Sequence, residues 1–383
     1  MISSTNEYAN YIIKSLNLNN NQPVEIVSPI ECKELVDILK NLLIVNERRV
    51  YVTFTNFIND YNVDRSIDFY EELMDLKFAR ITIVSSFAMP KSKGYIESQF
   101  PKLRSYFYNN QSQRVMCAYP NLTWSKRLGI NYSELKKRII DLSLKENKML
   151  KYIDKLNDLP IKKLYITTSL GTNLKMELTK GFSFNSGIIK TVDGIDFLPN
   201  IPALEIFTSP IKDRVDGVIV GSKPVYINNH IISDFMIEFK DGEIINSKGI
   251  DSIITMDRSL NYVGEIGISI YNEMVFYNTL LDENTATHIA LGNSYNMGIL
   301  KSERGKINRS KYHIDLPFGN NDIMISFLDR NDNILAVFNN DEVIFNKWEH
   351  MIYIMITKIK KELNMSSIRK LEALKEKKID YYA

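Results

Sequence analysis

The chain has 383 residues, of which 44% are hydrophobic and 25% are charged. This length exceeds the usual size of a single hydrophobic core, and the composition excludes disordered and fibrous classes, so a globular protein with two domains is favoured. The 48 lysines and arginines are nearly balanced by 46 acidic residues, which leaves no large field of one sign to bind nucleic acid.

The start of the chain, MISSTNEYANYII, lacks a basic segment followed by an apolar segment and a small-residue cleavage site, so we expect no secretory signal. The apolar run MIYIMITKI, near the end, is about half as long as a membrane span. The two cysteines, Cys32 and Cys117, are too few for a disulfide framework or a thiolate zinc site, and their apolar neighbours favour burial. We therefore expect a cytoplasmic protein without membrane contact.

Residues 1–158 alternate short apolar runs with amphipathic segments, which is typical of parallel βα units. The pattern predicts strands at 24–28, 50–54, 80–86 and 114–119, helices at 31–43 and 66–76, and a loop at 17–23. We expect an α/β domain with an open, mostly parallel sheet that is covered on both faces. No G-x-G-x-x-G follows the first strand and no G-x-x-x-x-G-K-[ST] occurs, so we interpret this domain as a scaffold without a phosphate site.

A charged helix is predicted at 132–155, and the pattern changes after the segment LNDLP, so we place the domain boundary near residue 158. Residues 159–383 contain many short strand patterns, and Asp241-Gly242 is the strongest hairpin signal among them. We expect a β-rich, barrel-like domain that ends in a helix at about 347–379. We interpret this lysine-rich helix as a solvated amphipathic helix that packs on the domain or on a dimer partner, with membrane or RNA contact as the alternative.

The residues that can carry chemistry lie in the second domain. They are Glu205, Glu265, Glu283, His288, His313 and Asp315. Each has apolar or small neighbours and is expected to be at least partly buried, and several buried carboxylates are tolerable only beside a neutralising cation. Nitrogen and oxygen ligands of this kind suit Zn, Co or Mn. Taken one at a time, each of these residues is more simply explained as a satisfied core residue.

Four segments, in this order, carry a resemblance to a known family: NIPALEIFTSP, GEIG, FYNTLLDENTATHIALGNSY and YHIDLPFG. They resemble the signature blocks of the aminopeptidase T family of metallo-aminopeptidases. VMCAYPNLTWSKRLG and LGTNLKMEL also resemble family segments, so the resemblance spans roughly residues 1–345. It implies an α/β first domain, a β-barrel-like catalytic domain and a cytosolic homodimer whose active sites face a shared interior. The segment between His288 and His313 is shorter than in the family, and the tail after about residue 347 has no counterpart there.

The resemblance also implies a role for each site residue. The implied metal ligands are Glu205, Glu265, His288, His313 and Asp315, and Glu283 is either a further ligand or a support for the ligands. The implied activity is removal of N-terminal residues from peptides with a free N-terminus, by a hydroxide that two divalent ions (Zn, Co, Mn or Mg) activate. Glu265 would bridge the ions and handle the proton, and Tyr295 would donate a hydrogen bond to the oxyanion.

The sequence is also compatible with two other function classes. His313 and Asp315, on one face of a strand through their i, i+2 spacing, imitate with His350 the two-His, one-carboxylate site of non-haem iron oxygenases. A non-catalytic binding protein that keeps only the fold is the other alternative. Bound metal distinguishes the three: two equivalents of Zn, Co or Mn for the peptidase, one iron for the oxygenase and none for the binding protein.

Overall fold

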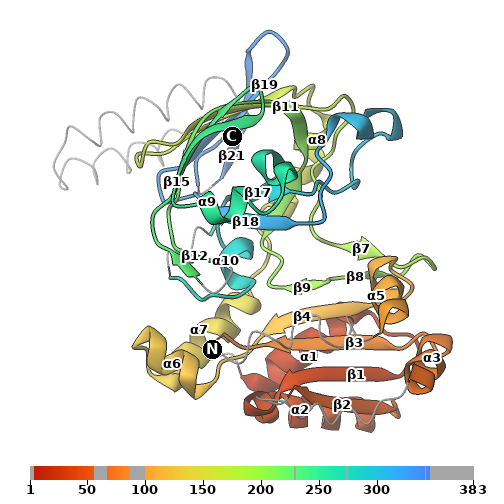
Figure 1. Ribbon diagram of the computed structural model, residues 1–383. Coiled ribbons are helices and arrows are strands. Elements are labelled where there is room, and N and C mark those ends of the chain that lie inside the picture. Colours follow the sequence, from red (N-terminus) through yellow and green to blue (C-terminus); the bar gives the residue numbers. More distant parts are fainter. Residues whose placement is uncertain are drawn as a thin grey trace, which may run out of the picture.

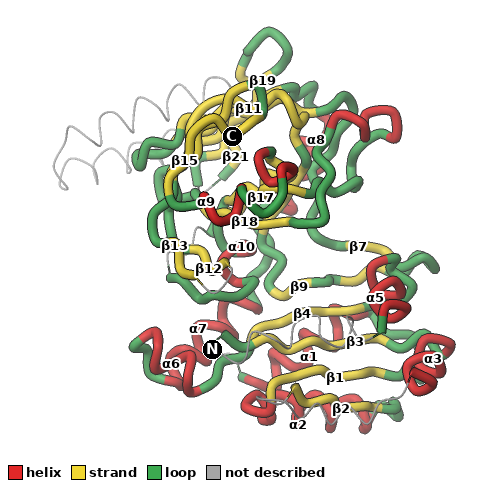
Figure 2. The backbone as a smooth tube through the Cα atoms, viewed as in Figure 1, coloured by secondary structure: helices red, strands yellow, loops and turns green. Residues whose placement is uncertain are grey.

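A computed structural model describes residues 4–55, 67–86, 100–227, 230–271, 275–340 and 342–345. They form a parallel sheet with helices around it and a second region that is built mainly from antiparallel strands (Figures 1 and 2). The mixed α/β architecture that we predicted is therefore present. His350 and the helix predicted at 347–379 lie outside the described residues.

The first sheet is parallel, with the strand order β2-β1-β3-β4-β9. Its strands are β1 (Val24–Pro29), β2 (Val50–Thr55), β3 (Ala79–Val84), β4 (Arg114–Ala118) and β9 (Asn200–Ile201). The first four strands confirm the predicted positions. β9 follows the predicted boundary near residue 158 along the chain, yet it pairs with β4 and so extends the first sheet.

Helices cover both faces of this sheet, as the alternating pattern predicted. The helices that the structure describes before residue 160 are α1 (Thr5–Leu16), η1 (Ile30–Cys32), α2 (Lys33–Val45), α3 (Ile67–Asp75), α5 (Pro101–Tyr108), α6 (Leu122–Leu128), α7 (Tyr132–Ser143) and α8 (Leu150–Asp158). Of these, α8 packs into the core of the second region instead, through Leu156 (Figure 1). The apolar sides of α1 and α2 pack on one face of the sheet. α3 and α5 pack on the other face, where Val27 of β1 joins their aromatic residues. Side chains alternate between the two faces of a strand, which explains why one strand contributes to both clusters.

The single helix that we predicted at 132–155 is wrong, because the structure has two helices, α7 and α8, separated by residues 144–149. Asn147 explains the break. Its Oδ1 accepts a hydrogen bond from the backbone N–H of Met149 at 3.0 Å, and its Nδ2 donates to the carbonyl of Glu205 at 2.7 Å. An asparagine side chain that binds nearby backbone groups competes with helix formation. The break thus fixes the backbone of Glu205.

The largest sheet is antiparallel and has the strand order β15-β14-β11-β6-β5-β19-β20-β21. Its strands are β5 (Lys163–Thr167), β6 (Asn173–Leu178), β11 (Pro210–Val220), β14 (Met236–Lys240), β15 (Glu243–Lys248), β19 (Met324–Leu328), β20 (Ile334–Phe338) and β21 (Val343–Ile344). The predicted hairpin is present, since Asp241 and Gly242 join β14 to β15 with φ angles of 50° and 80°. Within the described ranges β15 and β21 do not pair, so the barrel-like form is not confirmed.

A four-stranded antiparallel sheet has the order β10-β16-β17-β18. Its strands are β10 (Glu205–Thr208), β16 (Val263–Ser269), β17 (His288–Gly292) and β18 (His313–Pro317). Two small sheets pair β12 (Val225–Ile227) with β13 (His230–Ile232) and β7 (Ile189–Lys190) with β8 (Asp196–Phe197), and the short helices are α9 (Asp251–Ile254), η2 (Arg258–Asn261), α10 (Leu281–Asn284) and η3 (Lys301–Lys306).

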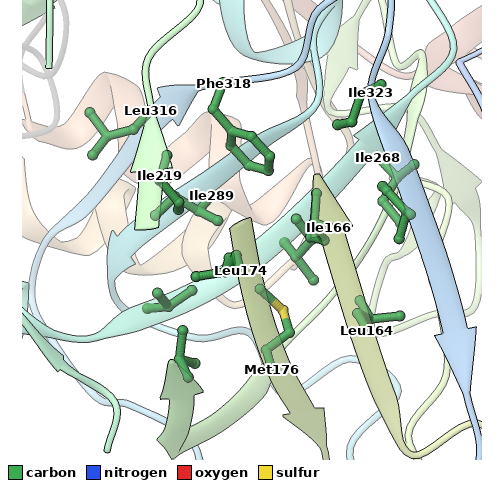
Figure 3. Close-up of a cluster of buried hydrophobic side chains, with 14 of the residues drawn as sticks. Leu164, Ile166, Leu174, Met176, Ile219, Ile268, Ile289, Leu316, Phe318 and Ile323 are labelled. Atoms are coloured by element: carbon green, nitrogen blue, oxygen red, sulfur yellow. The ribbon is translucent and has the colours of Figure 1, made fainter. Parts of the chain in front are cut away.

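The main core of the second region lies between the eight-stranded and the four-stranded sheet. Leu164, Ile166, Leu174 and Met176 extend from one sheet toward Ile268, Ile289 and Leu316 of the other (Figure 3). All of these side chains are fully buried, and burial of a side chain of this size stabilises a fold by roughly 1.5–3 kcal/mol. The four-stranded sheet is therefore held on a rigid support through one of its faces.

Cys32 and Cys117 are free and fully buried, as their neighbours indicated. Burial raises the pKa of both thiols to about 12, so neither is a reactive thiolate at neutral pH. None of the helices in the described part of the chain is long and apolar enough to cross a membrane. The cytoplasmic location stays a prediction.

Candidate metal centre

The two faces of the four-stranded sheet differ sharply. Its core face consists of branched aliphatic residues, among them Ile206, Ile266, Ile289 and Leu316. Because side chains alternate along a strand, the residues between them point to the opposite face. That face carries Glu205, Glu265, His288, His313 and Asp315. Strand register therefore brings together five of the residues that we proposed from the sequence.

Small residues separate these polar side chains. Ala290 of β17 lies opposite both Glu265 on β16 and Asp315 on β18, and Gly267 lies opposite His288. A Cβ atom on Gly267 would lie 2.7 Å from His288 Nε2 and would overlap with Glu205 Oε2. The space in front of the sheet thus depends on the small size of positions 267 and 290.

The side-chain atoms of the five residues converge on one point. His288 Nε2 lies 3.4 Å from Glu205 Oε2, 3.7 Å from Glu265 Oε1 and 3.5 Å from Asp315 Oδ1. His313 Nε2 lies 3.3 Å from Asp315 Oδ1 and 3.9 Å from Glu265 Oε1. Ligand atoms of Glu265, His288 and Asp315 all lie within 4.8 Å of one another. We call these five residues the carboxylate–imidazole cluster.

Backbone carbonyls orient both imidazole rings of the cluster. The carbonyl of Ala286 lies 3.0 Å from His288 Nδ1, and the carbonyl of Asn293 lies 2.8 Å from His313 Nδ1. A carbonyl can only accept, so Nδ1 must carry the proton and donate it to the hydrogen bond. The lone pair of a neutral ring is then on Nε2 and points to the carboxylates, which is the arrangement of metal-binding histidines.

The charges of the cluster shift one another's pKa values. Burial raises the pKa of Glu205 to about 8. Burial alone would lower the pKa of His288, but the carboxylates of Glu205, Glu265 and Asp315 together outweigh burial and raise that pKa well above its usual value. Burial also lowers the pKa of His313, but Asp315 and Glu265, with the carbonyl of Asn293, together raise it to about 10. A cation that binds here must displace protons from the imidazoles, so rising pH favours metal binding.

Two carboxylate oxygens of the cluster show that a cation fits. Glu205 Oε2 and Glu265 Oε2 are buried and accept no hydrogen bond from any described residue. A buried, unsatisfied carboxylate oxygen is costly, and a divalent cation coordinated by both oxygens would remove that cost. The donors are carboxylates and imidazoles without a thiolate, which is a ligand set for Zn, Co or Mn.

The two neighbouring acids of the short helix α10 have different environments. Burial raises the pKa of Asp315, but His313 and other neighbours lower it below its usual value. One of these neighbours is Glu283, through a side-chain hydrogen bond. Asp282 does not join the cluster. Its carboxylate accepts hydrogen bonds from the backbone N–H groups of Tyr277 at 2.8 Å and Thr279 at 3.2 Å. Glu283 is therefore positioned to support the cluster, whereas Asp282 stabilises the local fold.

Tyr295 lies beside the cluster. Its ring centroid is 4.9 Å from that of His313 and 6.0 Å from that of Phe207. Desolvation, together with the carboxylates of Glu265 and Asp315, raises the pKa of the Tyr295 hydroxyl above its usual value. The phenol is therefore neutral and able to donate. No described residue forms a hydrogen bond with this hydroxyl, so it is available to a bound molecule.

A cavity of about 1040 Å³ opens in front of the cluster. All five cluster residues line it, and so do Glu283 and Tyr295. Its other wall comes from the first sheet and its helix α5, through residues that include Thr82, Tyr108, Arg114 and Met116. The first domain is therefore part of the site and not only the scaffold that the sequence suggested.

The sequence pattern that defines the thermophilic metalloproteases (M29) matches residues 96–343, which contain the whole cluster. The chain belongs to this family. A metalloprotease family implies divalent metal ions, and the cluster contains suitable ligand atoms.

Individual members of the metalloprotease family match part of the chain. Aminopeptidase 2 of Geobacillus stearothermophilus is 29% identical over 220 residues, which is 52% of this chain and 53% of that protein. Aminopeptidase T of Thermus aquaticus is 28% identical over 176 residues, or 41% of this chain and 43% of that protein. The chain thus spans about half the length of the curated relatives that it matches. Wild-type AmpT from Thermus thermophilus has the same fold, with a TM-score of 0.73 at 19% identity over 88% of this chain and 98% of that one.

Sequence reasoning missed several residues that shape the site. Asn147 fixes the backbone of Glu205, and the carbonyls of Ala286 and Asn293 orient the imidazoles. A backbone carbonyl cannot be predicted as an acceptor from the sequence, because every residue type has one. Gly267 did leave one, because a glycine inside a strand indicates close approach of another group. Arg114 lies far from the cluster in sequence, and only the fold brings it to the cavity.

A methyl group at position 267 tests how much the centre depends on free space. We expect Gly267→Ala to lower metal affinity by roughly 10- to 100-fold, because the added Cβ displaces Glu205 and His288 from their positions. Overpacking should also destabilise the fold by about 1–3 kcal/mol. Metal titration and thermal unfolding measure the two effects.

The matched control is Gly305→Ala, since nothing lies within 4 Å of a Cβ at that exposed position. It should retain the metal affinity of the wild type. If Gly267→Ala also binds metal as the wild type does, the ligands are not held where the structure places them.

Proposed function

We propose that the chain is a metal-dependent aminopeptidase that removes N-terminal residues from peptides and holds two divalent cations, Zn, Co, Mn or Mg. The observation that supports this most directly is the carboxylate–imidazole cluster, in which two buried carboxylate oxygens lack a donor among the described residues. Glu205, Glu265 and Asp315 together carry more negative charge than one divalent ion neutralises, which supports a second ion. Membership of the metalloprotease family supports the same reaction class.

The proposed roles follow from what each side chain touches. Glu205, Glu265, His288, His313 and Asp315 would hold the cations. Divalent cations supply Lewis acidity there, which lowers the pKa of water and polarises a peptide carbonyl. Glu265 is 4% exposed and faces both imidazoles, which supports a role in which it would accept a proton from the attacking water and pass it to the leaving amine.

Tyr295 is proposed to stabilise the transition state. Its hydroxyl is neutral and free of described partners, and its ring lies against His313 at the edge of the cluster. A donor that meets the oxyanion of a tetrahedral intermediate typically contributes about 10²- to 10³-fold in rate. The free amino group of the peptide would bind to a cation held by the cluster, which supports an exopeptidase. Glu283, next to Asp315, would support the ligands of the cations.

Two matched peptides and a chelator test this proposal. We expect a peptide with a free N-terminus to be trimmed from that end, its N-acetylated twin to stay intact, and hydrolysis to stop on chelation and return with added metal. Mass spectrometry of the products and metal analysis of the protein measure these results. Full activity of the metal-free protein would remove the metal from the reaction, and equal cleavage of both twins would indicate an endopeptidase.

The alternatives make different predictions for the same metal analysis. A non-haem iron site would hold one iron and would need His350, which lies outside the described residues. That alternative also leaves Glu205 and Glu265 without a task, although the structure brings both to the cluster. A non-catalytic binding protein would hold no metal. The homodimer expected from the resemblance stays a prediction.

A further inference from the structure

The charges that line the cavity are distributed unevenly. The acidic side chains lie at the four-stranded sheet and at α10; they are Glu205, Glu265, Asp282, Glu283 and Asp315. Across from them, the first sheet presents two arginines to the cavity, Arg80 on β3 and Arg114 on β4. These arginines are neighbours in the parallel register of the two strands. A molecule that spans the cavity therefore meets the proposed metal ligands at one end and arginine side chains at the other.

The two arginines differ in their partners. Arg80 is 2% exposed, and its Nη2 lies 2.7 Å from Glu25 Oε2, so its charge is neutralised within the fold. Arg114 has no such partner: no carboxylate of the described residues forms an ion pair with it. Its Nη1 donates to the carbonyl of Phe107 and, at 2.9 Å, to Oδ1 of Asn110. These two bonds fix the guanidinium at the end of α5.

Fixation through Nη1 leaves Nε and Nη2 of Arg114 without a partner among the described residues. A guanidinium presents its donors in a planar fork that matches the two oxygens of a carboxylate. Arg114 is partly buried, and this burial lowers its pKa. A partly desolvated cation without a counter-ion at a cavity wall is suited to an anionic group of a ligand.

Arg114 also has a defined position relative to the cluster. Arg114 and Tyr295 line the same cavity. The ring of Tyr295 in turn lies 4.9 Å from that of His313. The cavity wall therefore runs from the carboxylate–imidazole cluster through Tyr295 to Arg114.

We propose that Arg114 binds the C-terminal carboxylate of the substrate, so that the chain acts preferentially on short peptides with a free C-terminus. This inference rests on the proposed aminopeptidase function. A short peptide is a zwitterion, with an ammonium group at the end to be cleaved and a carboxylate at the other end. The metal centre proposed at the cluster would hold the amino end, and Arg114 lines the same cavity, where it can meet the carboxylate end. The cavity volume of about 1040 Å³ is at the upper end of the range for small-ligand sites.

The wild-type protein gives the first test, which needs no substitution. Pairs of peptides from two to six residues are compared, each as the free acid and as the C-terminal amide, with the same N-terminal residue. The acid of one short length should exceed its amide in kcat/KM by at least about tenfold, since charge-assisted hydrogen bonds are lost in the amide. The preference should fall for longer peptides, whose carboxylate lies beyond Arg114. Equal rates for acid and amide at every length would overturn the inference.

Substitution of Arg114 then tests whether this residue causes the preference for the free acid. Arg114→Met should reduce the ratio of acid to amide to near one, and Arg114→Lys should restore part of it, because lysine keeps the charge but loses the planar fork. The control is Arg104→Met, which removes an exposed arginine of α5 that does not line the cavity and should keep the wild-type ratio. Metal content and circular dichroism show whether the variants are folded.

The outcomes separate this inference from the function on which it rests. If the wild type cleaves neither acid nor amide, the aminopeptidase proposal fails. If it cleaves both and a folded Arg114→Met keeps the wild-type ratio, the function stands and the role of Arg114 is wrong. A preference that follows acidic side chains instead of the C-terminus would also contradict the inference.

Discussion

His288→Ala is expected to remove metal and activity together, each by more than about 100-fold. The Nε2 atom of His288 lies between 3.4 and 3.7 Å from carboxylate oxygens of three residues, Glu205, Glu265 and Asp315. Loss of the ring removes one nitrogen ligand from the centre of this group. Loss of a group that only supports metal ligands already costs about 10- to 100-fold in metal affinity, so loss of a ligand should cost more.

Metal analysis, with kinetics at rising metal concentration, measures the effect of His288→Ala. Because the three carboxylates and His313 remain, excess metal should restore part of the metal content and part of the activity. A His288→Ala protein with full metal content and wild-type turnover would show that this imidazole is only a structural element of β17. Unchanged metal content with lost activity would assign His288 to the chemistry alone.

Tyr295→Phe is expected to give the opposite combination: full metal content and a fall in kcat of roughly 10²-fold or more. The substitution removes one hydroxyl, which forms no hydrogen bond with a described residue, and keeps the ring that packs against His313 and Phe207. Substrate affinity should change little, because an oxyanion forms only in the transition state.

Steady-state kinetics and metal analysis on the same preparation decide the role of Tyr295. Loss of metal in Tyr295→Phe would place the phenol among the ligands. Loss of neither metal nor rate would make Tyr295 a packing residue. His288→Ala and Tyr295→Phe serve as mutual controls, since they alter neighbouring side chains and are expected to separate metal binding from turnover.

The sequence predicted the elements that depend on local patterns. Strands β1 to β4 and the Asp241-Gly242 hairpin follow from alternating apolar residues and from turn chemistry, and the structure has them at the predicted positions. The helix at 132–155 was wrong because Asn147 uses its side chain to bind the distant carbonyl of Glu205. Such a bond depends on tertiary structure, which a local pattern does not contain.

The site was also only partly predictable from the sequence. Residue type and apolar surroundings made the five cluster residues candidates, the resemblance to the aminopeptidase T family selected them as ligands, and strand register brings them to one face. Their roles stay predictions. Residues of the other wall of the cavity, such as Arg114, could not be proposed, because their approach depends on the packing of the first sheet against the second region. The pairing of β9 with β4 is part of that packing.

The hydrogen bonds to His288 Nδ1 and His313 Nδ1 have an evolutionary consequence, since both acceptors are backbone carbonyls, at positions 286 and 293. Every amino acid supplies the same carbonyl, so no point mutation can delete either acceptor. The side chains at these two positions can therefore change during evolution while each ring keeps its tautomer. Insertions or deletions next to β17 and β18 would disrupt the centre instead, because a shift of one residue in strand register turns both rings away from the carboxylates.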